Sequence, residues 1–366
     1  TPMSPHPMSD PFPARDLAQG RRIALALMAG GGALAVTGLV LRPLEFGYAW
    51  LMAYLVCVGL PLGALFLVMM HHLFDAGWSV PLRRTYEHLA CLSSPVLLVL
   101  WVPVGVLAPQ LYPWMRPELQ GQSDPALAAQ APRFGIGGFY AASLVCFAVW
   151  HLVSGRLRAW SLRQDATGAA ECTYALRRWS AAGLFPYAAT VTLAAILWMK
   201  ALSGQWVSTM YGVYSFCGSV WFALANVYVI TLWLERTGLL RYRLRQHQYS
   251  LLGALFFAFT VFYAYIHFSQ YFVIWNANVP RETFWYQLRE QGSWHGVGVL
   301  LIFGHFLFPF LALLRMDAKH CFPLMVGLWG WSWLMHSTDV AFNVLPLPHP
   351  DGVPWRWLWL PVGCLA

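Results

Sequence analysis

Nine apolar runs, each about as long as a lipid bilayer is thick, divide this 366-residue chain. A helix needs roughly 20 predominantly apolar residues to cross the hydrocarbon core. The runs lie at about 22–41, 46–71, 88–109, 134–157, 179–201, 208–234, 249–275, 294–314 and 321–345, and a tenth begins at "RWLWLPVGCLA". Only 10% of the residues are charged, whereas water-soluble domains carry about 25%. The sequence therefore predicts an all-α integral membrane protein with about ten transmembrane helices.

The apolar runs also predict how the chain is organised. Residues 1–20 contain five prolines and are expected to form an irregular cytoplasmic tail. The first transmembrane helix is expected within residues 21–45, as a retained span, because the run lacks the A-x-A-like ending of a cleaved signal peptide. Two blocks of four spans follow, at 46–201 and 202–346. Residues 347–366 are expected to form an outer loop and the start of the tenth span.

Basic residues are distributed unequally between the two sides of the predicted membrane. With the spans as given, 16 of the 23 Lys and Arg residues fall on the side of the N-terminus and 7 on the other side. Because cytoplasmic loops of membrane proteins carry the excess of Lys and Arg, the N-terminus is expected in the cytoplasm. The net charge of +8 is therefore interpreted as membrane topology, and no nucleic-acid partner is expected.

The cysteines exclude several cofactors from this chain. All seven stand singly, and neither CxxC nor CxxCH occurs. Covalently bound haem c, iron–sulfur clusters and thiolate zinc sites all need such grouped ligands. No Walker loop, GxGxxG, HExxH or GxSxG motif is present either. The sequence therefore predicts no metal site and no covalently bound cofactor.

Ionisable and polar residues within apolar runs are the candidate functional residues, because a charge inside a bilayer is costly and usually marks an ion, proton or substrate path. An outer group is expected at Tyr263, His267, Gln270, His336 and Asp339. His336 and Asp339 are three residues apart and share one helix face. A carboxylate facing an imidazole at low dielectric can hold and pass on a proton, so this group is predicted to line an outer proton path or to lie near a quinol.

A second group lies nearer the cytoplasmic ends of the spans. It is predicted to form an inner proton path and consists of His71, His72, Glu87, His88, His151, Asn226 and His305. Two alternatives remain open. His151 and His305 are equally well explained as hydrogen-bonded packing residues. The residues between 71 and 88 are also typical of solvated helix ends.

Several segments resemble one family of respiratory membrane proteins. The strings are "FSQYFVIWNANVP" (268–280), "STMYGVYSFCGSVWFALA" (208–225), "GALFLVMMHHLFDAGWSVPLRR" (63–84), "GHFLFPFLALL" (304–314) and "MHSTDVAFNVLP" (335–346). They resemble the NrfD-type, or polysulfide-reductase-type, membrane subunits, and among these the second such subunit of alternative complex III, a bacterial quinol:cytochrome c oxidoreductase.

The resemblance implies a fold and a set of partners. It implies ten spans arranged as two four-helix bundles with two peripheral helices, in the bacterial cytoplasmic membrane. It also implies a homologous NrfD-type subunit that binds quinol, a multihaem cytochrome c subunit, an iron–sulfur subunit and a monohaem cytochrome c subunit. Haem c and the iron–sulfur clusters would belong to those partners. Quinone or quinol is a possible ligand of this chain, which the resemblance leaves open. Lipids and a supercomplex with a terminal oxidase are further expected partners.

The resemblance is imperfect at the end of the 249–275 span. Arg281 and Glu282 stand where the family usually has an acidic pair, and Asn276 stands where Tyr is common. These changes weaken the expectation of quinol binding more than that of proton transfer. The loop that carries Asn276, Asn278, Arg281 and Glu282 is predicted to dock the extracytoplasmic redox subunits.

Four interpretations of the function remain open. The chain supports proton translocation, oxidises quinol itself, serves as an inert scaffold for cytochrome subunits, or is a secondary transporter. Asp339 and His267 are essential in the first two and dispensable in the third. The fourth lacks its usual sign, a matched pair of helices interrupted at the membrane midplane.

Overall fold

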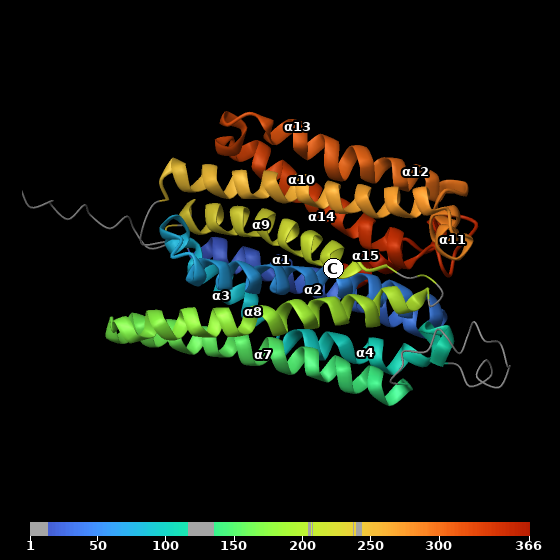
Figure 1. Cartoon of the computed structure of the whole chain (residues 1–366), viewed down its shortest axis with the longest axis horizontal. Helices are drawn as coiled ribbons and strands as arrows, with labels where there is room; N and C mark the ends of the chain where they lie inside the picture. The colour runs from blue at the N-terminus through green and yellow to red at the C-terminus, as the bar shows by residue number, and fades with distance from the viewer. Residues whose placement is uncertain (1–13, 116–134, 204–205, 207, 237, 239–243) are drawn as a thin grey trace, which may run out of the picture.

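The computed structural model describes residues 14–115, 135–203, 206, 208–236, 238 and 244–366 (Figure 1). These residues form helices and no strand. Eight of their helical segments are long and apolar enough to cross a membrane. The eight are Gln19–Leu41, Pro43–Leu73, Gly77–Leu111, Gly135–Thr167, Ala170–Leu202, Tyr211–Arg236, Gln246–Ala277 and Gly292–Leu314. The chain is thus an all-α, multi-pass membrane protein, as the apolar runs predict.

The first two helices meet almost without a linker. Helix α1 spans Ala14–Leu41 and α2 spans Pro43–Leu73, so only Arg42 separates them. The expected irregular tail is therefore too long, because residues 14–20 already belong to α1, and its remainder lies outside the described residues. The expected first span, 21–45, crosses the actual junction. Proline is favoured at the first position of a helix, since its missing amide N–H has no partner there anyway, and Pro43 opens α2 in this way.

The third apolar run is divided into two helices. Helix α3 spans Arg83–Cys91 and α4 spans Val96–Leu111, after a 3₁₀ turn at Gly77–Leu82. Residues 92–95 form a turn between them that ends at Pro95, which has no amide N–H to continue α3. The next two helices, α7 (Gly135–Thr167) and α8 (Ala170–Trp198), are long and uninterrupted at their expected places.

The second half of the chain contains the remaining helices. They are α9 (Tyr211–Arg236), α10 (Gln246–Ala277), α11 (Pro280–Arg289), α12 (Gly292–Leu300), α13 (Phe308–Leu314), α14 (Phe322–Val344) and α15 (Trp359–Leu365). A π-helical segment, Leu301–Leu307, joins α12 to α13. Helix α14 occupies the expected ninth span but is not among the eight most apolar segments. The expected tenth span is represented by the short α15, which packs on α1 and α2.

Helix α2 is the central element of the structure. In Figure 1 it lies between a layer of α4, α7 and α8 and a layer of α9, α10, α13 and α14. It contacts α3, α4 and α8 as well as α9 and α14. Of its most apolar window, 83% is buried, whereas α1 buries only 17%. A helix that is apolar on every side and buried on every side forms the core, and the other helices pack around it.

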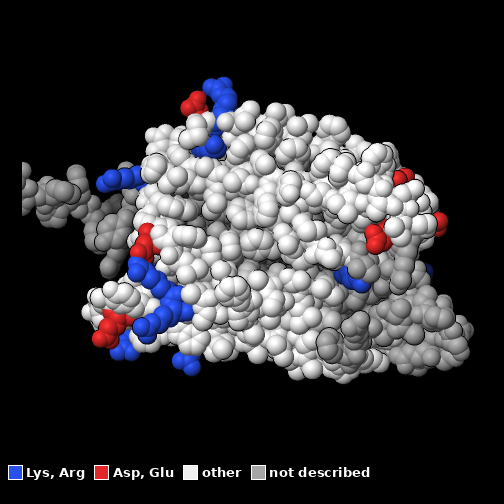
Figure 2. Space-filling model, in the orientation of Figure 1, with Lys and Arg blue, Asp and Glu red and all other residues white. Residues whose placement is uncertain are grey.

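Charged side chains gather at the ends of the helices. Figure 2 shows Lys and Arg mainly at the end of the molecule where α3 and the α7–α8 connection lie, and an uncharged surface in between. Large apolar side chains such as Val99, Phe185 and Phe268 are exposed on the middle of the helices. This arrangement is the one expected of a surface that faces lipid.

Candidate functional site

A buried carboxylate lies at the centre of the polar cluster between α9, α10 and α14. Asp339 is 3% exposed. The hydroxyl of Tyr214 donates a short hydrogen bond to Asp339 Oδ1, and His267 Nε2 lies 3.6 Å from the same oxygen. The hydroxyl of Tyr263 is 2.8 Å from His267 Nε2. The structure therefore brings together four residues from three helices, with the carboxylate of Asp339 at their centre.

A second layer of hydrogen bonds holds this carboxylate in place. The amide of Asn343 donates to the Tyr214 hydroxyl and to the Asp339 carbonyl, both at 2.8 Å. Tyr211 donates to Asn343 Oδ1 at 2.7 Å. Asn343 follows Asp339 by one helical turn, so both side chains lie on the same face of α14. Asp339 is thus fixed by a network that leaves its side chain little freedom to rotate.

Arg289 closes the end of the cluster nearest α11. It lies at the end of α11, outside the membrane-spanning helices, and is 2% exposed. Its guanidinium donates to the carbonyls of Phe342, Asn343 and Trp285 at 2.8 to 2.9 Å. Burial lowers the pKa of Arg289 to about 9, which still leaves the group charged at neutral pH. A cation at this position stabilises the last carbonyls of α14, which have no partner within the helix.

Two further imidazoles face Asp339. One ring atom of His305, one of His336 and one Asp339 oxygen lie within 4.8 Å of one another. Both rings are buried, and none of their four nitrogens has a hydrogen-bond partner among the described residues. An unsatisfied buried polar group costs about 1–3 kcal/mol, so water, a proton or a bound ion is needed here. Among the residues that the structure describes, these three form the one group of His, Cys, Asp or Glu side chains placed closely enough to hold a metal ion.

The position of His305 corrects the expected grouping. The sequence predicts it in the inner group, whereas in the structure it lies beside His336 and Asp339 of the predicted outer group. It lies in the π-helical segment, which turns its ring toward the cluster. There it stacks between Tyr263, at 3.9 Å, and Trp221, at 4.2 Å between ring centroids. Such π-helical turns are frequent at functional sites, because they rotate one side chain out of the α-helical register.

A cavity adjoins the cluster on the side of α2 and α8. Its volume is about 50 Å³. The polar residues in its lining are His336, Asp339, Tyr214, Asn343, Ser215 and Ser219, and the remainder is mostly apolar. A water molecule needs about 10–15 Å³ by the same measure, so the cavity has room for a few waters. It is too small for a quinol ring unless side chains move.

Gln270 and the expected docking residues lie away from Asp339. Gln270 accepts a hydrogen bond from Ser208 at 3.3 Å. Asn276 is exposed in the last turn of α10, and Asn278 ends this helix in the left-handed conformation, with φ 49°. Pro280 then begins α11, and Glu282 lies in its first turn. The expected loop is therefore a helix end followed directly by a helix start. The side chain of Arg281 lies outside the described part of the chain.

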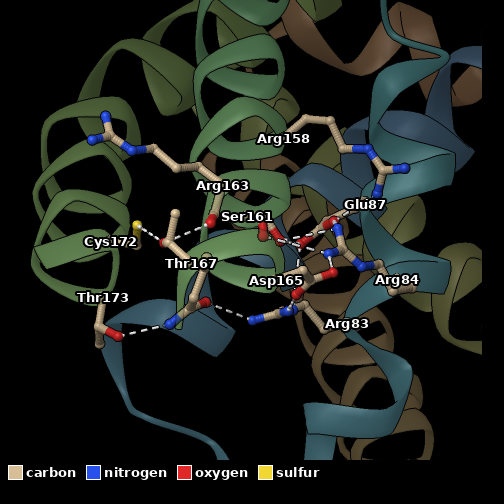
Figure 3. Close-up of polar contacts among 11 residues, drawn as sticks. Arg83, Arg84, Glu87, Arg158, Ser161, Arg163, Asp165, Thr167, Cys172 and Thr173 are labelled. Atoms are coloured by element: carbon tan, nitrogen blue, oxygen red, sulfur yellow. Dashed lines mark hydrogen bonds and ion pairs between the residues drawn. The ribbon is translucent and has the colours of Figure 1, made fainter. Parts of the chain in front are cut away.

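Glu87, of the expected inner group, lies in a network of arginines (Figure 3). It is 2% exposed, and its carboxylate lies 2.5 Å from Arg84, 2.7 Å from Arg158 and 3.5 Å from Arg83. Ser161 of α7 donates a short hydrogen bond to it. The network ties α3 to α7, because Arg83, Arg84 and Glu87 belong to α3 and Arg158 and Ser161 belong to α7.

The other residues of the expected inner group are spread over separate places. His71 shares a hydrogen bond of 2.7 Å with Ser79, and His72 lies beside it with Nε2 unpaired among the described residues. His88 and His151 are exposed. Asn226 is buried, and its Oδ1 accepts hydrogen bonds from two indoles of α14, Trp329 at 2.9 Å and Trp333 at 3.0 Å.

Sequence reasoning missed Tyr214, Asn343 and Arg289. Spacing offered a signal for two of them: Asn343 is four residues after Asp339, and Tyr211 and Tyr214 are three apart on one helix face. Nothing in the sequence indicates that Arg289 is buried. Compared with known proteins, the sequence matches no protein-family model and no curated protein.

Proposed function

We propose that this chain is an NrfD-type membrane subunit of a quinol:cytochrome c oxidoreductase of the alternative complex III kind, and that it supports proton translocation. The observation that carries the proton role is the buried Asp339 with His267, His305 and His336 around it. Groups that can take up and release protons at low dielectric are costly and mark a path when they occur inside a membrane protein.

The contacts of the cluster support a relay of protons. Tyr263, His267 and Asp339 are joined by contacts of 2.8 and 3.6 Å, and Tyr214 bonds to the same carboxylate oxygen. The side chain of His267 is 35% exposed, so the chain of contacts runs from the edge of the bundle to its buried centre. Waters in the adjoining cavity would extend it toward α2.

Quinol oxidation by this chain is the second candidate. The cavity beside His336 and Asp339 favours it, because a quinol oxidase needs proton acceptors next to an apolar space. The volume of about 50 Å³ favours water and protons instead, and for this reason we rank proton transfer first.

We further propose a topology with ten membrane spans, two more than the eight long apolar segments. We place α14 and α15 with them as the ninth and tenth spans, in two four-helix bundles with α1 and α15 at the periphery. The N-terminus would lie in the cytoplasm of a bacterial cell, and α11 would face the outside. The exposed end of α10 and the start of α11 would then dock the cytochrome and iron–sulfur subunits.

The Asp339→Asn variant tests the proton role. Asparagine keeps an oxygen that can accept the Tyr214 hydrogen bond but cannot bind and release a proton. We expect the variant to assemble normally and to lose proton release by about a hundredfold, the low end of what a positioned acid–base group contributes. The measurement is quinol-driven proton release per electron by the purified complex in liposomes, with the haem c spectrum as a measure of assembly.

Asp317→Asn is the matched control, because Asp317 is an exposed carboxylate whose ion-pair partner, Arg315, is also exposed. It is expected to leave proton release unchanged. An unaltered proton stoichiometry in Asp339→Asn would contradict the proton role. Purification of the native chain without any haem-containing partner would contradict the assignment to the respiratory complex.

A further inference from the structure

The three residues His305, His336 and Asp339 offer a set of metal ligands that the sequence did not predict. One ligand atom from each lies within 4.8 Å of the others. His305 comes from the π-helical segment, and His336 and Asp339 come from α14. His336 and Asp339 follow His305 by 31 and 34 residues, a spacing that matches no known short motif, so only the fold brings His305 to the other two.

Both imidazoles stack on aromatic rings and have unpaired nitrogens among the described residues. His305 is 0% exposed and His336 is 5% exposed. The His305 ring stacks on Tyr263 and Trp221, and the His336 ring stacks on Phe222 at 4.6 Å between centroids. None of the four ring nitrogens has a partner among the described residues. Stacking fixes the planes of the rings while leaving their edges free to bind.

We infer that His305, His336 and Asp339 bind a divalent ion of the Zn²⁺ class. Two neutral imidazoles and one carboxylate are the donor set that borderline first-row metals prefer, and three protein ligands leave one position open. His336 and Asp339 also line the neighbouring cavity, which has room for water that would complete the coordination. Tyr214 and His267 both approach the same carboxylate oxygen, Oδ1, and hold the carboxylate in a fixed orientation.

The surroundings indicate that the ion is exchangeable and not a permanent structural part. Ligands at about 2.0–2.2 Å from a metal lie roughly 3–4 Å apart, so the side chains must move by about 1 Å to close around it. Tight sites also hold the second nitrogen of each histidine with a hydrogen bond, and loss of such a partner lowers affinity 10- to 100-fold. His305 and His336 have no such partner in the described structure.

Cobalt is a suitable probe, because tetrahedral Co²⁺ replaces Zn²⁺ and has visible absorption bands. The purified complex is treated with a chelator, desalted and titrated with Co²⁺ and then with Zn²⁺. We expect one Co²⁺ per chain, displaced by Zn²⁺. The variants His305→Gln, His336→Gln and Asp339→Asn are each expected to weaken binding by about 100-fold or more. His295→Gln, which removes an exposed histidine of α12, is expected to bind as the native chain does.

Two results would overturn the inference: no stoichiometric binding by the native protein, or binding that persists in both histidine variants. If the variants do not fold, X-ray absorption at the zinc edge of the native complex decides between two imidazoles plus oxygen and any other ligand set. The site does not depend on the proposed function. Zn²⁺ that binds without slowing proton release supports the metal site and counts against the proton path.

Discussion

At the scale of single residues, Arg289 shows how a charge can be buried without a carboxylate. Its guanidinium lies 3.5 Å from the centroid of the Trp285 ring, and it donates to three backbone carbonyls. A planar group with five donors can satisfy several carbonyls at once, whereas a lysine ammonium cannot reproduce this geometry. The residue thereby fixes the end of α14, the helix that carries Asp339.

Replacement of Arg289 by alanine tests this role. The variant leaves two carbonyls of α14 without a partner, and we expect it to lower the free energy of unfolding by about 3 kcal/mol, as for lost hydrogen bonds to a charged group. Arg289→Lys is expected to recover only part of this loss. The measurement is the Tm of the detergent-solubilised protein. Arg315→Ala removes an exposed arginine and is expected to leave the Tm unchanged. Equal Tm values for native protein and Arg289→Ala would contradict the capping role.

At the scale of helices, the contact between α2 and α9 depends on one glycine. A Cβ placed at Gly63 would lie 2.7 Å from the Cβ of Ala223, and it would also clash with the backbone at Ser219. Small residues let membrane helices approach closely, and α2 and α9 use Gly63 in this way. The same approach brings α2 against the His336 ring, since a Cβ at Gly59 would lie 3.2 Å from His336 Nε2.

Gly63→Leu is therefore expected to push α2 and α9 apart. Overpacking costs about 1–3 kcal/mol, and more where backbone must move, as it must here. We expect a lower Tm and faster hydrogen exchange in α9. The matched control is Gly327→Leu in α14, because a Cβ at Gly327 meets nothing within 4 Å. A Gly63→Leu protein as stable as the Gly327→Leu protein would show that the close approach is not needed.

The contacts of Glu87 fit two roles, a structural link between α3 and α7 or a place in the predicted inner proton path. As a clamp between α3 and α7, Glu87 would contribute to stability and not to proton transfer. We expect Glu87→Gln to lower the free energy of unfolding by about 3 kcal/mol, because it leaves partly buried arginines without their counter-charge. Proton release, measured in liposomes, is expected to stay unchanged.

The surface pair between Asp75 and Arg177 provides the comparison for Glu87. Both side chains are at least 40% exposed, and exposed pairs contribute little. Asp75→Asn is therefore expected to leave the Tm unchanged. The opposite result for Glu87→Gln, an unchanged Tm with reduced proton release, would contradict the structural role and support the predicted inner proton path.

At the scale of the whole molecule, the distribution of charge predicts the orientation in the membrane. Basic residues gather at the end that carries α3 and the start of α14 (Figures 1 and 2). Cys321 is exposed at the start of α14, and α11 lies at the opposite end. If basic loops face the cytoplasm, Cys321 faces the cytoplasm as well.

Labelling of Cys321 tests this orientation. A membrane-impermeant maleimide is expected to react in inverted vesicles and not in right-side-out vesicles. The Cys321→Ser variant is expected to lose the label, which excludes the other cysteines as its source. Labelling of the native chain from the outside would reverse the proposed topology.

Some of the structure was predictable because it depends on local chemistry. The length of an apolar run determines whether a helix can span the membrane, and the expected spans appear as helices from α1 to α14. The shared face of His336 and Asp339 followed from a spacing of three residues. Boundaries were less predictable, since the helix start at Ala14 and the break before Pro95 depend on packing as well as on composition.

The sequence alone determined that this is an all-α membrane protein with polar residues in its spans, because hydrophobicity and helical periodicity are properties of neighbouring residues. Which of these polar residues meet depends on how the helices pack in three dimensions. In the structure, His305 lies beside Asp339, and Glu87 is surrounded by arginines from two helices. Arg289 is buried at the end of α14. Arg84 and Glu87 are only three residues apart, but the contacts of Glu87 with Arg158, of Arg289 with Asn343 and of His305 with Asp339 join residues far apart in the chain. These long-range contacts depend on how whole helices pack, and the spacing of neighbouring residues does not predict them.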